Sequence, residues 1–238
     1  MPQTWEKALD SYNYEVRLAE FQDAQMYPGW FKWDTGNGDR ARTMEFEKRF
    51  RKLAPDHLEA WYEVVFWKLY SSDGAASHRA RTVINAIKES GVSAPQLWLL
   101  CQRYIDEPNR ENFQSFRQNL VTSSAVAVAA TFPAFACPEK FPMVDKHVTD
   151  WARHNGSHHG NQKPVGTILA EAPDLSGSVT ALRDDLMVHR RFVQSWNDWC
   201  QFIAELLNQR TNRHWRARDV EMAVFTAQRD GLPLNPLG

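Results

Sequence analysis

The sequence of 238 residues has few cysteines, no excess of one charge and no long apolar run. Its three cysteines, Cys101, Cys137 and Cys200, are scattered and lack the spacing of metal ligands, which favours a reducing compartment. No apolar stretch approaches the roughly 18 residues of a membrane span, and the N-terminal residues are too polar and acidic for a signal peptide. We therefore expect a cytoplasmic protein with no membrane partner.

A basic excess is also missing from the chain. The sequence has 28 lysines and arginines against 29 aspartates and glutamates, a balance that argues mildly against binding nucleic acid. Local groups of positive charge matter more for such binding, and the most suggestive one spans residues 210–218. Arg213 and Arg216 in this group are candidate phosphate contacts, and the alternative is an ordinary solvated connection.

The alternating apolar pattern of β-strands is absent as well. Nearly every segment repeats its apolar residues with helical spacing, so the sequence predicts an all-α fold. We find no internal repeat, and the length and hydrophobic content allow one large domain or two closely packed lobes. The predicted helices cover residues 5–26, 43–53, 56–70, 77–89, 95–105, 109–120, 124–135, 145–154, 182–208 and 218–228.

The most informative segment runs from residue 123 to residue 148. Its helix is built almost entirely from small residues at 125–130, a surface that another backbone can approach closely, and Pro138 and Pro142 then enforce an extended turn. Asp145 opens the next helix. A carboxylate at that position serves either as an N-cap or, if it faces a cleft, as a catalytic anion.

This segment resembles the helix-hairpin-helix DNA glycosylase superfamily, which includes endonuclease III and the alkyladenine and 8-oxoguanine glycosylases. Residues 144–148, Val-Asp-Lys-His-Val, match the apolar-Asp-x-His-apolar turn that follows the hairpin in that family. The resemblance implies a two-lobed fold, with residues 1–75 and 180–238 in a terminal lobe and residues 76–179 in a hairpin lobe that carries a polar insertion at 154–178. It makes Asp145 the catalytic residue. The DNA-binding residues it implies are Asn119, Val121, Ser123, Ser124, Lys146 and His147.

Three departures from the family pattern narrow the expected chemistry. Asn119 and Val121 stand at the two glycine positions of the hairpin, and valine does not tolerate the left-handed backbone that glycine supplies there. Ser123 replaces the lysine with which bifunctional members form a Schiff base, so the resemblance implies an enzyme without lyase activity. The cysteine cluster that holds iron and sulfur in some members is missing, so no cofactor is expected.

Two loops are candidates for contacts with the substrate. The Gly-rich segment 28–40 contains Trp30, Phe31, Lys32 and Trp33, whose rings either stack on an extruded base or anchor the loop by burial. The second loop carries His154, His158 and His159 without a closing carboxylate or thiolate, and we expect no metal there.

The function implied is a monofunctional DNA glycosylase that acts as a monomer on double-stranded DNA. It would flip a modified or damaged base, hydrolyse its N-glycosidic bond and leave an abasic site. The base is either a repair substrate or a glucosylated hydroxymethylcytosine of phage DNA, removed in antiviral defence. Two other interpretations are a non-catalytic DNA-binding protein of the same fold and a helical protein-interaction domain.

Overall fold

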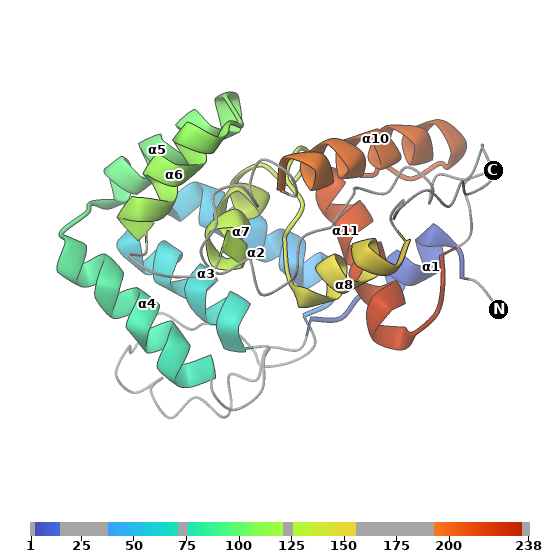
Figure 1. The fold of residues 1–238 in the computed structure, drawn as a ribbon, viewed down its shortest axis with the longest axis horizontal. Helices are drawn as coiled ribbons and strands as arrows, with labels where there is room; N and C mark the ends of the chain where they lie inside the picture. The colour runs from blue at the N-terminus through green and yellow to red at the C-terminus, as the bar shows by residue number, and fades with distance from the viewer. Residues whose placement is uncertain (1–2, 15–37, 71–75, 121–125, 156–192, 235–238) are drawn as a thin grey trace.

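The computed structural model describes residues 3–14, 38–70, 76–120, 126–155 and 193–234, which form ten α-helices and no sheet (Figure 1). The prediction of an all-α fold is therefore confirmed for the described residues. None of their helices combines the length and the apolar character that a membrane crossing requires.

Most helices begin and end within a few residues of the predicted positions. The prediction was wrong for residues 5–26, because the first helix ends at Asp10 and Ser11 caps it. Residues 15–37 and 156–192 lie outside the described part of the chain. The helices are α1 (Trp5–Asp10), α2 (Arg40–Leu53), α3 (Leu58–Tyr70), α4 (Ala76–Ser90), α5 (Ala94–Asp106), α6 (Arg110–Leu120), α7 (Val126–Ala136), α8 (Lys146–Asn155), α10 (Gln194–Arg210) and α11 (Ala217–Asp230).

Local sequence signals fix several helix ends. The Ser93 hydroxyl accepts the Gln96 N–H while the Gln96 side chain accepts the Ser93 N–H, a capping box that starts α5. Asp39 caps α2 by accepting the Arg42 N–H over 2.9 Å. Helix α11 stops at Gly231, whose φ of 65° lies in the left-handed region that favours glycine.

The described helices form two groups that lie side by side (Figure 1). In the first group, α2 and α3 pack against the apolar helix α7, and α4, α5 and α6 complete it. Aromatic rings fill its interior, where Trp61 lies 5.0 Å from Phe132 and 5.3 Å from Phe50 between ring centroids. In the second group, α11 is buried from Ala217 to Ala227 and contacts α1, α8 and α10.

A division into lobes at residues 75 and 180 stays a prediction. Two sets of helix contacts bear on this division. Helices α2 and α3 contact α7, and α8 contacts α11. Helix α8 therefore follows α6 and α7, the helices of the predicted hairpin, in the chain but packs on the C-terminal helix. This arrangement brings the start of α8 to the end of α3, where the two groups of helices meet.

Candidate functional site

Asp145 lies directly before α8, at the end of a buried segment. Phe141, Met143 and Val144 are buried and hold this segment in the core. The Oδ1 atom of Asp145 accepts the Val148 N–H over 2.9 Å, so the carboxylate caps α8. Its side chain remains 12% exposed. The cap occupies one carboxylate oxygen and leaves the other to a different partner.

That partner is Lys68, in the last turn of α3. Its Nζ atom lies 3.8 Å from Asp145 Oδ2, and the residue is only 7% exposed. Burial lowers the pKa of the Lys68 ammonium from 10.5 to about 8, an effect that Asp145 opposes and the Arg218 cation reinforces. Sequence analysis did not select Lys68 as a site residue. The sequence does contain a signal for it, because Lys68 is the single charged residue within the apolar run 64–69 of a predicted helix.

Tyr14 joins this site from the N-terminal part of the chain. Its hydroxyl donates to the Lys68 carbonyl over 3.1 Å, and the Lys68 Nζ lies 5.9 Å from the centroid of its ring. The Tyr14 N–H donates to the Gly38 carbonyl over 3.1 Å. A Cβ atom on Gly38 would lie 2.1 Å from the Tyr14 carbonyl oxygen, so this close approach requires glycine.

Tyr14 and Gly38, which flank residues 15–37 in the sequence, therefore meet near Lys68. The predicted base-pocket residues belong to that segment, and they lie outside the described residues: Trp30, Phe31, Lys32 and Trp33.

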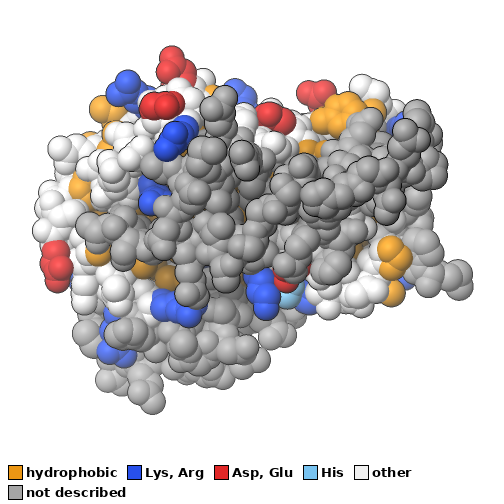
Figure 2. Space-filling view, in the orientation of Figure 1, with side chains coloured by type: hydrophobic (Ala, Val, Ile, Leu, Met, Phe, Trp, Pro, Cys, Tyr) orange, Lys and Arg blue, Asp and Glu red, His pale blue; other side chains and the backbone are white. Residues whose placement is uncertain are grey.

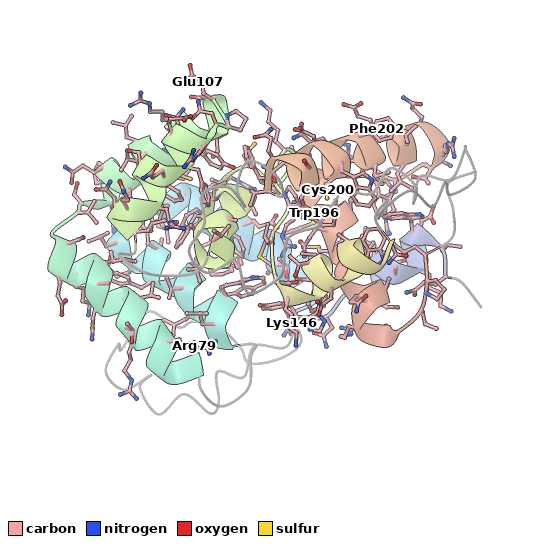
Figure 3. The ribbon with its side chains drawn as sticks, viewed as in Figure 1. Arg79, Glu107, Lys146, Trp196, Cys200 and Phe202 are labelled. Carbon is pink, nitrogen blue, oxygen red and sulfur yellow. The ribbon has the colours of Figure 1, made fainter. Side chains whose placement is uncertain are left out.

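Two predicted DNA-binding residues follow Asp145 directly. Lys146 and His147 are exposed at the start of α8, and the His147 ring packs edge-on against Phe225 at 5.0 Å between centroids. Lys146 and Arg79 of α4 are both exposed and both lie in the lower half of the view in Figure 3. Lysine or arginine, acidic and histidine side chains meet on the surface over the start of α8 (Figure 2).

The predicted hairpin is described only in part. Its two helices are present as α6 and α7, which contact each other. Asn119 lies inside the last turn of α6, and its side-chain amide donates to the Ser115 carbonyl over 2.8 Å. Val121, Ser123 and Ser124 lie outside the described residues. A phosphate contact from the hairpin turn therefore stays a prediction.

The two arginines selected from the basic segment differ in their surroundings. Arg213 is half-buried, and its guanidinium contacts the exposed Asp10 carboxylate at 2.7 Å. Arg216 is 4% exposed, which corrects the expectation that it contacts phosphate at the surface. Its guanidinium donates to Glu47 over 2.6 Å and to Asp219 over 2.8 and 2.9 Å. Internal carboxylates thus satisfy this charge.

The Arg216 contacts belong to a buried charge network that joins α2 to α11. Burial works to raise the pKa of Asp219, but hydrogen bonds from Arg216 and Arg40 hold it at about 2. Burial raises the pKa of Glu47 in spite of the neighbouring arginines. Arg218 is fully buried and pairs with Glu221 and with the Tyr12 hydroxyl. The network lies under the candidate site and fixes the helix on which α8 packs.

Metal ligands do not gather in the described part of the chain. No group of three or more His, Cys, Asp or Glu side chains there has an arrangement that would hold an ion. The side chains of His154, His158 and His159 are not among those described.

The site thus combines a partly exposed carboxylate, a buried ammonium group and an exposed Lys-His pair. A carboxylate in this setting can stabilise positive charge that develops on a bound molecule. Comparisons with protein-family models, with curated proteins and with solved structures give no match for this chain.

Proposed function

We propose that this protein is a monofunctional DNA glycosylase in which Asp145 is the catalytic residue. It removes a modified or damaged base from double-stranded DNA and leaves an abasic site. Candidate substrates are glucosylated hydroxymethylcytosine of phage DNA and the deaminated, alkylated or oxidised bases of DNA repair.

The observation that carries the proposal is the state of the Asp145 carboxylate. It is fixed by the Val148 N–H on one oxygen and faces the Lys68 ammonium with the other, yet it is still 12% exposed. An aspartate that only caps a helix needs no second charged partner. The exposed Lys146 and His147 beside it offer donors to a DNA phosphate.

The reaction would proceed by extrusion of the base and cleavage of its bond to the sugar. Extrusion costs a few kcal/mol, and it is needed because stacking shields the anomeric carbon. As the base leaves, positive charge develops on the sugar, and the Asp145 carboxylate stabilises it electrostatically. Water then adds to the anomeric carbon, and Asp145 orients it or accepts its proton.

The test of this proposal is release of bases by the purified protein. It is incubated with genomic DNA from ordinary bacteria and from phages that carry modified bases, and freed bases and alkali-sensitive sites are measured. We expect Asp145→Asn to lower turnover by about 100-fold or more. Its fold and its affinity for DNA should persist, because the asparagine oxygen can still cap α8. Asp150→Asn, the same change within α8, is the matched control. Full activity of Asp145→Asn would rule out the proposed role.

The cap itself favours a second candidate, a non-catalytic DNA-binding protein of the same fold. The bond from Val148 to Asp145 stabilises α8 without any chemistry. Salt-dependent DNA binding without base release from any DNA would identify this function. Negligible DNA binding at low salt would instead favour a helical protein-interaction domain.

A further inference from the structure

We propose that Lys68 is a positioning residue for Asp145, whose ammonium group fixes the carboxylate for base release. The proposal deepens the glycosylase function and rests on it. It assigns a role in that reaction to a side chain of α3, a helix remote in sequence from the predicted hairpin and from the turn that follows it.

The geometry shows how Lys68 would act. Oδ1 of Asp145 accepts the Val148 N–H, and Oδ2 lies 3.8 Å from the Lys68 Nζ. With one partner on each oxygen, rotation of the carboxylate about its Cβ–Cγ bond breaks both interactions. Lys68 approaches from the protein interior, so the partly exposed face of Asp145 stays open to a sugar. Catalytic groups held in this way need no reorganisation during the reaction.

Burial of the Lys68 ammonium group destabilises the folded state, which argues against a purely structural role for this residue. Moving an ammonium group out of water costs several kcal/mol, and the Asp145 carboxylate at 3.8 Å offsets only part of that cost. An apolar side chain between Trp67 and Leu69 would stabilise the core better. Ionisable groups whose pKa is strongly perturbed by burial together with a specific charged partner cluster at functional sites.

Among the described residues, charged or titratable groups face the Lys68–Asp145 pair from several elements. Asp145 precedes α8, Tyr12 and Tyr14 come from the segment after α1, and Arg218 comes from α11. Arg218 repels the ammonium group, and its own charge is balanced by Glu47 and Glu221. Among the described residues, the Asp145 carboxylate favours the charged form of Lys68.

This arrangement predicts a specific pH dependence of base release. Because Lys68 has a pKa of about 8, its positive charge is lost as the pH rises through that value, and Asp145 then loses its second partner. Activity should fall over the same interval. In Lys68→Arg the cation persists to far higher pH, so the fall near pH 8 should disappear while most activity at neutral pH is retained.

The experiment compares kcat, KM and pH profiles of the full-length wild type, Lys68→Met and Lys68→Arg on the DNA from which the wild type releases a base. Lys68→Met should lower kcat by about 100-fold at unchanged KM, which is the usual effect of a misplaced catalytic group. Lys52→Met, which alters an exposed lysine on α2, is the matched control. The proposal is overturned if Lys68→Met matches the wild type or if the Arg variant keeps the fall near pH 8. A covalent adduct between Lys68 and DNA, trapped by borohydride, also overturns it, because Lys68 would then be the nucleophile.

A second readout does not depend on catalysis. The pKa of Lys68, followed by NMR of its side chain, should fall further below about 8 in Asp145→Asn, since burial is retained and the anion is lost. An unchanged pKa would show that the two groups do not interact, which overturns the proposal. A wild type that releases no base from any DNA would overturn the glycosylase function, whereas the NMR titration judges the Lys68–Asp145 pair separately.

Discussion

Replacing Lys68 by methionine should stabilise the folded protein at neutral pH. The ammonium group is buried, and its pKa is lowered from 10.5 to about 8, mainly by burial. This difference corresponds to roughly 3 kcal/mol of free energy that the charged lysine costs the folded state. Methionine fills a similar volume with an unbranched apolar chain. Asp145 loses its partner in the variant, but it keeps the Val148 N–H and contact with solvent.

The sign of the pH dependence follows from proton binding. Between about pH 8 and pH 10.5, the unfolded chain holds a proton on Lys68 that the folded protein has released. The free energy of unfolding of the wild type therefore rises through this interval relative to Lys68→Met. The advantage of the variant is largest below pH 8 and shrinks by about 3 kcal/mol as the pH approaches 10.5.

Urea denaturation of both proteins at a series of pH values measures this difference. With a slope of about 2–3 kcal/mol per molar urea, the expected midpoint shift at neutral pH is roughly 1 M. Lys52→Met should change stability by less than about 0.5 kcal/mol at every pH, because that lysine is exposed. A Lys68→Met variant that is less stable than the wild type, by an amount independent of pH, would refute the reasoning and make Lys68 a stabilising structural residue.

Three further substitutions test other parts of the structure. Asp219→Asn should reduce the free energy of unfolding by about 3–5 kcal/mol in urea, because it removes one of the two carboxylates that pair with the buried Arg216; a loss under about 1 kcal/mol would contradict the buried pairing. Gly38→Ala should lower the melting temperature, because its Cβ would lie 2.1 Å from the Tyr14 carbonyl oxygen, and an unchanged melting curve would speak against that close contact. Burial raises the pKa of Glu63 from 4.5 to about 7, so wild-type stability should decrease relative to Glu63→Gln as the pH rises between these values; parallel pH profiles of the two proteins would exclude the shift.

Helix positions could be predicted well where the signals are local. The predicted helix 95–105 became α5 (Ala94–Asp106), because Ser93 and Gln96 form its capping box within the same short stretch. The predicted helix 5–26 failed because a distant contact decides its end. Tyr12 packs against Phe225 of α11 at 5.8 Å between ring centroids, and the chain leaves the helix to place it there.

The residues of the candidate site also differ in whether local sequence or distant contacts determine their role. Asp145 could be selected from its neighbours in the sequence, since the turn and the helix start are contiguous. Arg216 was misread because its partner Glu47 is 169 residues away, and a charge pattern does not report pairing over such a separation. Lys68 was missed for a related reason. The role proposed for Lys68 requires contact with Asp145, and the packing of α8 beside the end of α3 brings the two side chains within 3.8 Å.

The burial of α11 has a consequence for synthesis of the protein in the cell. Helices α1, α8 and α10 all pack on α11, and Arg218 of α11 donates to a tyrosine that lies 206 residues earlier in the chain. At about 5–20 residues per second, a ribosome needs roughly 10–40 s to cover that distance. Until α11 emerges, α1 and α8 lack the helix on which they pack, so nascent chains that stop before α11 should bind chaperones or aggregate.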